Sequence, residues 1–229
     1  MPERLGILGG TFDPIHRGHI ETAETVKACL GLDRVLLTPS HVPPHRSAAP
    51  RASSFDRFAM TALAAAAHPG LVASAIELVR EGPSYTADTL DLLHAAGHAA
   101  SQLFFITGAD AFAEIATWRR YPALLDACHF VAVARPGFSL AELRLRLPSL
   151  RDRLRVVDGT APRDETPGAI YLVDMPTPDV SSTDIRERLA RGHSCDDVLA
   201  PFVADYIASH GLYRPATDGA AVLPGATLA

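Results

Sequence analysis

Hydrophobic residues occur along the chain in short runs that alternate with longer stretches of helical periodicity. The short runs are rich in Val, Ile, Leu and Phe at successive positions, which is typical of strands buried on both faces. We predict strands over Arg4–Leu8, Arg34–Thr38, Leu71–Ile76, Gln102–Thr107, His129–Ala134, Leu154–Val157 and Ala169–Asp174. The periodic stretches predict helices over Gly18–Leu30, Ser54–Ala67, Ala87–Ala96, Ala109–Thr117, Leu140–Leu147, Thr183–Arg191 and Asp196–His210.

The alternation of strand and helix indicates the fold class. It predicts an α/β protein with a doubly wound, mostly parallel sheet, whose ligands bind at the carboxyl ends of the strands. The chain of 229 residues is long enough for one large domain. We predict this domain over residues 1–214, with a helical C-terminal portion from about residue 181. Residues 215–229 lack periodicity and are expected to form a disordered tail.

Composition and charge narrow the range of partners. The net charge of -5 argues against a nucleic-acid or anionic-membrane binder, because both need a basic face. No apolar run approaches the roughly 18–20 residues of a membrane span, and no signal peptide precedes the first strand. The three cysteines form no C-x-x-C pair, which favours free thiols in a reducing compartment. We therefore expect a cytoplasmic protein without nucleic-acid or membrane partners; whether it forms a homo-oligomer is left open.

The segment GGTFDPIHRGH, Gly9–His19, follows the first predicted strand directly. Its two leading glycines let the backbone approach a ligand closely and expose N–H groups. The helix that begins at Gly18 carries partial positive charge at its N-terminus. His16 and His19 lie one helical turn apart, so both rings can donate hydrogen bonds to phosphate oxygens there. The segment is a candidate polyphosphate site, although two neighbouring histidines are more often satisfied surface groups.

Other common phosphate and catalytic signatures are missing from the sequence. There is no G-x-G-x-x-G fingerprint and no G-x-x-x-x-G-K-[ST] loop, and the single lysine, Lys27, lies within a predicted helix. H-E-x-x-H and G-x-S-x-G are also absent, which argues against the commonest zinc proteases and serine hydrolases. Chemistry that depends on positioning a phosphate group remains the candidate.

Two motifs carry a resemblance to a known superfamily. HRGH, His16–His19, matches the (H/T)-x-G-H motif of nucleotidyltransferases, and SSTDIR, Ser181–Arg186, matches their S-S/T-x-I-R motif about 160 residues later. The likeness runs from about Leu5 to Tyr213 and is most specific to the bacterial nicotinate-nucleotide adenylyltransferases. Its other supporting segments are PPHR (Pro43–Arg46), PSYTADTL (Pro83–Leu90), ITGADAF (Ile106–Phe112) and Trp118. One departure is Arg46, where family members often have lysine, which changes the donor geometry.

The resemblance implies a Rossmann-like nucleotidyltransferase fold and adenylyl transfer from ATP to nicotinate mononucleotide in NAD biosynthesis. It implies four catalytic residues: His16, His19, His45 and Arg186. The implied ATP-binding residues are Gly9, Gly10, Thr11, Phe12, His16, His19, Ser182, Thr183 and Arg186. The implied mononucleotide-binding residues are His45, Arg46, Ser84, Tyr85, Thr86, Asp110, Trp118 and Arg135. Mg²⁺ is expected as a cofactor that bridges the ATP phosphates, with no ligand from the protein.

The acceptor must be distinguished from its amide analogue by a ring carboxylate. A helix that begins near Ser84 or Thr86, either of which is a plausible N-cap, favours an anion at its N-terminus. The resemblance further implies that Trp118 stacks on the pyridine ring and that Asp110 accepts from ribose hydroxyls. Two alternatives stay open: a related transferase acting on phosphopantetheine or nicotinamide mononucleotide, and a nucleotide sensor without turnover.

Overall fold

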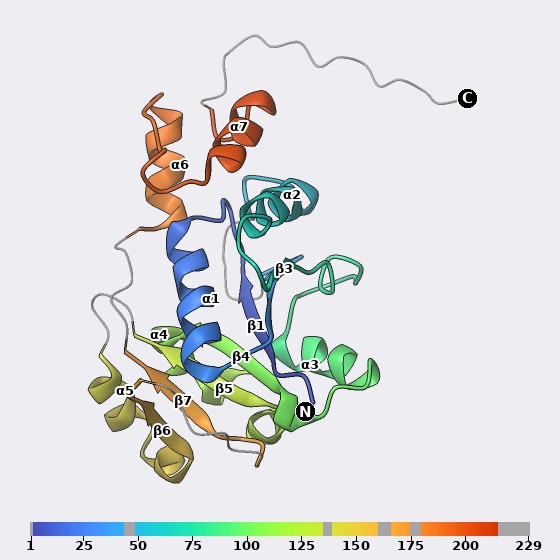
Figure 1. The fold of residues 1–229 in the computed structure, drawn as a ribbon, viewed down its shortest axis with the longest axis vertical. Coiled ribbons are helices and arrows are strands. Elements are labelled where there is room, and N and C mark those ends of the chain that lie inside the picture. Colours follow the sequence, from blue (N-terminus) through green and yellow to red (C-terminus); the bar gives the residue numbers. More distant parts are fainter. Residues whose placement is uncertain (1, 44–48, 135–138, 160–165, 175–179, 215–229) are drawn as a thin grey trace.

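The computed structural model describes residues 2–43, 49–134, 139–159, 166–174 and 180–214. Its strands are β1 (Leu5–Gly10), β2 (Arg34–Pro39), β3 (Leu71–Ala73), β4 (Leu103–Gly108), β5 (His129–Val133), β6 (Leu154–Val157) and β7 (Ile170–Val173). They form one seven-stranded sheet in the order β3-β2-β1-β4-β5-β7-β6 (Figure 1). Every neighbouring pair is parallel. The strand order reverses between β1 and β4, so a crevice for a ligand is expected at the carboxyl ends of these two strands.

Helices cover both faces of the sheet. They are α1 (Arg17–Leu30), α2 (Ser54–Ala65), α3 (Thr86–Ala95), α4 (Ala109–Phe112), α5 (Leu140–Arg146), α6 (Ser182–Ala190) and α7 (Pro201–Ser209). Ile7 and Leu8 are successive residues of β1 whose side chains belong to different buried clusters. The cluster of Leu8 includes side chains of α1, α2, α6 and α7, and that of Ile7 includes side chains of α3, α4 and α5. The predicted doubly wound parallel sheet is confirmed.

Helix α1 illustrates how the local sequence builds these layers. Its buried residues are spaced three to four apart, which places them on one face against the sheet: Ile20, Ala23, Val26 and Leu30. The helix ends at Gly31, which has φ of 60° and so adopts the left-handed conformation that glycine tolerates best. At the other end of the chain, α7 is joined to α2 by a hydrogen bond from the Tyr206 hydroxyl to Oδ1 of Asp56 at 2.9 Å.

The structure differs from the sequence prediction at two helices. The helix predicted over Ala109–Thr117 is interrupted: α4 ends at Phe112 and a separate 3-10 turn covers Ile115–Thr117. After Phe112 the backbone bonds shorten to three-residue spacing: the N–H of Glu114 donates to the carbonyl of Ala111 at 3.2 Å, and that of Thr117 donates to the carbonyl of Glu114 at 2.9 Å. The Thr117 hydroxyl donates to the same Glu114 carbonyl at 2.8 Å, which favours this tighter turn. The helix predicted over Asp196–His210 begins only at Pro201, because proline lacks the N–H of a helix interior and suits the first helical position.

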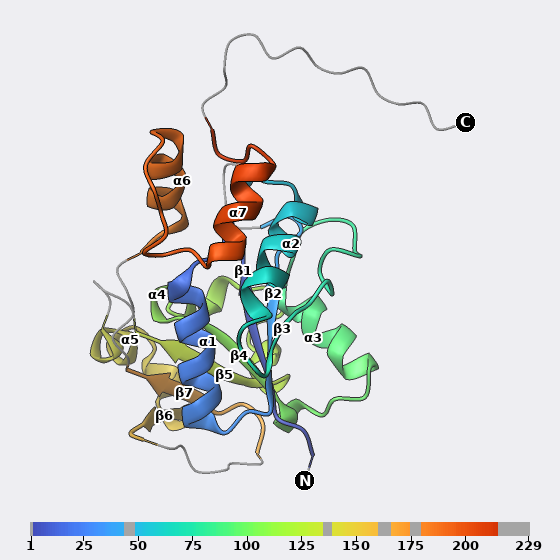
Figure 2. The ribbon, with the colours of Figure 1, turned by 45° about the horizontal axis from the view of Figure 1, so that its top comes forward.

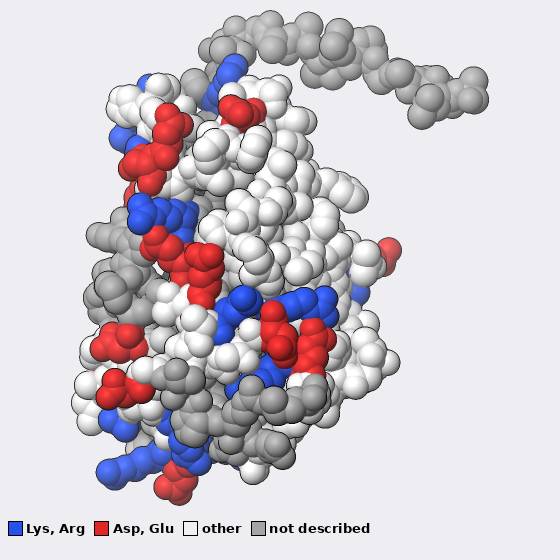
Figure 3. Space-filling view, viewed as in Figure 1, with Lys and Arg blue, Asp and Glu red and all other residues white. Residues whose placement is uncertain are grey.

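Charged groups of opposite sign are neighbours over much of the surface. Figure 3 shows acidic and basic side chains interleaved on one face, beside a broad uncharged area over α2 and α7. Ion pairs between such groups include Arg188 with Asp197 and Arg153 with Asp126, each 2.6 Å apart. Within the described residues, no helix is both long and apolar enough to cross a lipid bilayer.

Candidate active site

The loop between β1 and α1 is tightly packed at Gly10 and Phe12. A Cβ atom at Gly10 would lie 2.6 Å from Cε1 of Phe12, so no larger residue fits at this position. Phe12 itself has a positive φ of 49° and is 1% exposed. Its ring meets that of His19 edge-on, with centroids 4.9 Å apart. The side chain of Phe12, a residue predicted to bind ATP, therefore lies in the core, where it packs against the His19 ring.

The two imidazoles of the first motif lie against each other. Their ring centroids are 3.8 Å apart, and the N–H of His16 donates to Nδ1 of His19 at 3.2 Å. Because Nδ1 accepts this bond, a neutral His19 ring carries its proton on Nε2, which makes that atom a donor. His19 lines the cavity described below, whereas His16 is 7% exposed.

The second motif docks onto the loop of the first. Nη1 of Arg186 donates to the carbonyl of Asp13 at 2.7 Å, and Nη2 donates to Oγ1 of Thr183 at 3.1 Å. The Ser182 hydroxyl donates to the carbonyl of Pro14 at 2.9 Å. Figures 1 and 2 show the start of α6 beside the start of α1. Two segments from opposite ends of the chain thus meet at one corner of the sheet.

Backbone N–H groups remain open at both helix starts. The side chain of Ser181, the N-cap of α6, accepts from the N–H of Asp184. The N–H groups of Ser182 and Thr183 have no acceptor within the described part of the chain. At α1 the N–H of Arg17 donates to the carbonyl of Val198 at 2.9 Å, whereas the N–H of Gly18 has no acceptor among the described residues. The corner therefore combines helix-terminal amides with a guanidinium and an imidazole, a donor set suited to phosphate oxygens.

Asp13 is a residue of this corner to which sequence reasoning assigned no role. Its carboxylate is 3% exposed and accepts from the N–H groups of Arg51 and Ala52, at 2.9 and 3.0 Å. It also accepts from the Tyr213 hydroxyl at 2.8 Å and lies 3.8 Å from the Arg186 guanidinium. Burial, together with the charge of Asp13, raises the pKa of Tyr213. One buried carboxylate thus ties together three segments that are distant in sequence, and only its place within the first motif marks it in the sequence.

Arg57 of α2 fixes the same loop from inside the protein. Its side chain is 1% exposed and donates to the carbonyls of Thr11 and His41, at 2.7 and 3.3 Å. Burial lowers the pKa of this guanidinium, and the charge of Asp13 opposes that shift. The contact holds the ends of β1 and β2 at a set separation, which shapes the floor of the site.

A cavity of about 360 Å³ opens at the carboxyl ends of β1 and β4. It brings together residues predicted for the two substrates: Gly9, Gly10, Thr11 and His19 for ATP, and Ser84, Tyr85, Thr86 and Trp118 for the mononucleotide. The other predicted residues that the structure describes do not line it: Phe12, His16, Asp110, Ser182, Thr183 and Arg186. Asp110 is exposed, between the cavity-lining Gly108 and Ala111. His45, Arg46 and Arg135 lie outside the described residues.

The start of α3 forms one wall of the cavity, and its N-cap differs from the prediction. The cap is Tyr85, without a side-chain hydrogen bond, instead of Ser84 or Thr86. The reason is that Oγ of Ser84 accepts from the N–H of His41 at 2.8 Å. The N–H groups of Thr86 and Ala87 have no acceptor among the described residues, and both residues line the cavity.

Glu77 is a second residue that sequence reasoning missed. It lines the cavity but is only 6% exposed, and burial raises the pKa of its carboxyl. Hydrogen bonds from the hydroxyls of Thr89, at 2.7 Å, and Ser84 oppose this rise, as does the charge of Arg80. Glu77 therefore holds two hydroxyls at the start of α3. A single glutamate in a stretch without a motif carries no sequence signal for this position.

Trp118 also lines the cavity. Its indole packs edge-on against Phe105 and Phe130, with ring centroids 6.0 and 6.4 Å away. The side chain is partly buried and lines the cavity. A flat apolar surface in the same cavity as a helix N-terminus suits an aromatic ring that carries an anionic substituent.

Comparisons with known proteins identify a family of similar sequences and a similar fold. A family model described as cytidylyltransferase-like matches residues 7–188. A protein of Yersinia pestis (strain Pestoides F) named "Probable nicotinate-nucleotide adenylyltransferase" is 43% identical over 211 residues, covering 91% of this chain and 94% of that protein. A protein of the same name from Moorella thermoacetica is 43% identical over 218 residues, covering 95% of each. The structure of Plasmodium falciparum nicotinic acid mononucleotide adenylyltransferase complexed with NaAD superposes with a TM-score of 0.69 at 18% identity, covering 93% of this chain and 98% of that one. At that identity the structural likeness concerns the fold.

Proposed function

The chain belongs to the nicotinate-nucleotide adenylyltransferase family of cytidylyltransferase-like proteins, and on this premise we propose that it transfers the adenylyl group of ATP to nicotinate mononucleotide. The products are nicotinate adenine dinucleotide and pyrophosphate, and the reaction serves NAD biosynthesis. The observation that carries the proposal is the single cavity in which His19 faces the same space as Thr86 and Trp118. A phosphate donor and an aromatic acid can meet there.

The reaction requires that the two substrates are positioned, and it requires no covalent intermediate with the protein. A phosphate oxygen of the mononucleotide attacks the α-phosphorus of ATP, and the bond from that phosphorus to the bridging oxygen breaks as pyrophosphate leaves. The attacking oxygen is already anionic, so no side chain has to remove a proton from it. The barrier falls when the reactants are aligned and the charge on the leaving group is neutralised. His19, which presents Nε2–H, is suited to the second task, and His16 supports it.

The triphosphate is held from two sides. The start of α1 lies on one side, and the start of α6, with its open amides at Ser182 and Thr183, lies on the other. Arg186 adds a positive charge next to Thr183. The Ser182 hydroxyl donates to Pro14, so its contribution to phosphate binding comes from the backbone N–H. We assign this second helix start to the β- and γ-phosphates.

ATP enters as its Mg²⁺ complex. Within the described residues, no group of three or more His, Cys, Asp or Glu side chains could hold a metal ion. We expect Mg²⁺ to bind with the ATP phosphates, where it would neutralise their charge, and we assign it no ligand from the protein. The protein is expected to act in the cytoplasm, and its three free cysteines suit a reducing compartment.

Thr86→Pro should lower the preference for the acid acceptor over its amide. Thr86 is the first residue of α3, where proline is well tolerated, and the extended backbone of Tyr85 is compatible with a following proline. The substitution deletes one N–H that we assign to the ring carboxylate. We expect the ratio of kcat/KM for nicotinate over nicotinamide mononucleotide to fall about tenfold, the size of one hydrogen bond to a charged group. Thr86→Ala keeps the N–H and is the matched control. An equal fall of the ratio in both variants would show that the backbone N–H of Thr86 does not select the acid.

The proposed function is tested by a product assay with ATP, Mg²⁺ and three acceptors side by side. We expect pyrophosphate and a dinucleotide with nicotinate mononucleotide, less product with nicotinamide mononucleotide, and none with phosphopantetheine. Turnover of phosphopantetheine alone would assign the protein to a related transferase. ATP binding without any product would identify a nucleotide sensor and refute the proposal.

A further inference from the structure

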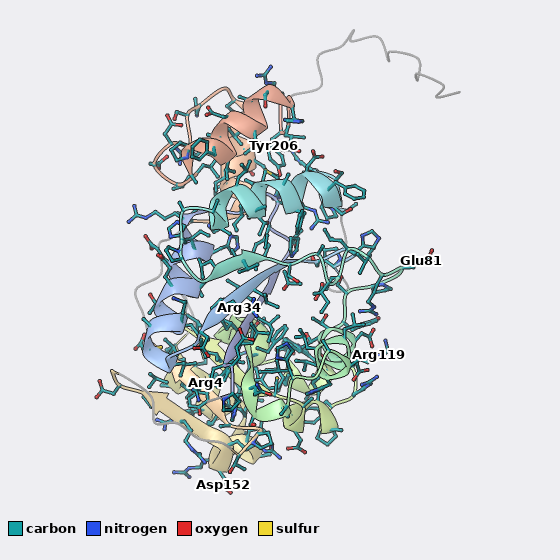
Figure 4. The ribbon with its side chains drawn as sticks, turned by 45° about the vertical axis from the view of Figure 1, so that its right-hand side comes forward. Arg4, Arg34, Glu81, Arg119, Asp152 and Tyr206 are labelled. Atoms are coloured by element: carbon teal, nitrogen blue, oxygen red, sulfur yellow. The ribbon has the colours of Figure 1, made fainter. Side chains whose placement is uncertain are left out.

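Two consecutive arginines follow Trp118, and they have different surroundings. Nη1 of Arg119 donates to Asp88 at 2.9 Å, and its guanidinium lies 5.1 Å from the centre of the Tyr85 ring. Arg120 donates to Asp91 through both Nη atoms, at 2.8 and 2.6 Å. Both arginines thus contact aspartates of α3, but Arg119 lines the cavity and Arg120 does not. Figure 4 marks Arg119 on the side of the molecule that carries α3.

Asp88 places a negative charge beside the amides that the proposed function assigns to the acceptor. It is the third residue of α3, directly after Thr86 and Ala87, and its side chain is 15% exposed. A carboxylate in the first turn stabilises the helix through its dipole. The same charge repels an anionic ligand that approaches those amides. The start of α3 can favour a carboxylate only if the charge of Asp88 is compensated.

Two guanidinium groups supply that compensation. Oδ2 of Asp88 accepts from Arg80 at 2.8 Å and from Arg119 at 2.9 Å. The side chain of Arg80 is 26% exposed and that of Arg119 is 50% exposed, so Arg119 is the outer member at the mouth of the cavity. Its position over the Tyr85 ring, a cation–π contact, holds the guanidinium close to the start of α3.

We propose that Arg119 is a specificity-determining residue that neutralises Asp88 and so allows the start of α3 to select an acceptor with a ring carboxylate over its amide. The inference rests on the proposed function. Arg80 still compensates Asp88 when Arg119 is absent, so the loss is partial. Without Arg119, the charge of Asp88 repels the ring carboxylate more strongly. The removal of Arg119 therefore weakens binding of the acid acceptor and leaves binding of the neutral amide almost unchanged.

The test compares Arg119→Gln with Arg120→Gln. For Arg119→Gln we expect the ratio of kcat/KM for the acid over the amide to fall about fivefold, the scale of a half-exposed ion pair. The change should arise from a higher KM for nicotinate mononucleotide, with KM for ATP within about twofold of wild type. Arg120→Gln removes a similar contact to α3 away from the cavity and should leave the ratio unchanged.

A rescue variant separates this role from a structural one. Asp88→Asn combined with Arg119→Gln removes the charge together with its partner, so the ratio should return toward the wild-type value. A loss of helix stability alone would show as a lower melting temperature without that rescue. If wild type prefers the acid but Arg119→Gln keeps the full ratio, or if the double variant shows no rescue, the inference is overturned. If wild type converts neither mononucleotide, the proposed function fails instead.

Discussion

Replacing His19 by alanine should lower kcat/KM about a hundred- to a thousandfold while the protein stays folded. Removing one donor aimed at developing negative charge in an enclosed site has an effect of this size. Nε2–H of His19 is that donor in our account, because Nδ1 is occupied by the N–H of His16. The ring is partly exposed at the start of α1, so its loss removes little buried surface. Steady-state kinetics and thermal unfolding on the same preparation check both statements.

The matched control for His19 lies two residues earlier. Arg17 occupies the same helical turn, but its side chain is 64% exposed and pairs with Glu21. Arg17→Ala should retain activity within about threefold, since an exposed ion pair contributes little. A comparable loss in both variants would indicate that the first turn of α1 is generally sensitive and that His19 has no special chemical role.

The second large effect is expected at Arg186. Its guanidinium donates to the Asp13 carbonyl and to Oγ1 of Thr183, so it joins the two motifs and places a positive charge beside Thr183, whose N–H is open. Arg186→Ala should lower kcat/KM for ATP about a hundredfold. Arg186→Lys should recover only part of this, because an ammonium cannot reproduce the planar fork of donors. Kinetics with ATP as the varied substrate, at saturating acceptor, provide the measurement.

A second arginine of the same helix controls for charge and for stability. Arg188 of α6 contacts Asp197 and the carbonyl of Ser194. Arg188→Ala removes the same charge from the same helix on the side away from the first motif. We expect KM for ATP to stay near the wild-type value in this variant. Equal effects of Arg186→Ala and Arg188→Ala would assign the loss to the helix as a whole.

The fold could be predicted because its strands are hydrophobic on both faces. Successive residues such as Ile7 and Leu8 enter opposite clusters, and continuous apolar runs of this kind separate a buried parallel sheet from one with a solvated face. Local periodicity was sufficient for the fold. The two motifs were recognised by their resemblance to the superfamily, and their meeting agrees with the rule that parallel strands end at one edge.

The details that shape the site depend on distant contacts, which periodicity does not contain. Asp13 collects donors from Arg51, Ala52 and Tyr213, and these partners are known only once the chain is folded. The N-cap of α3 was misplaced because Ser84 has its contact with His41, on a segment that precedes β3 in the chain. The order of strands across the sheet also follows from packing between layers and not from any one segment.

The decisive measurement is a crystal structure of the protein with Mg²⁺ and a nonhydrolysable ATP analogue. We expect one triphosphate that lies between the starts of α1 and α6. Its oxygens should be within about 3.2 Å of the His19 ring and also of the Arg186 guanidinium or the amides of Ser182 and Thr183. A triphosphate that contacts only one of the two helix starts would contradict it.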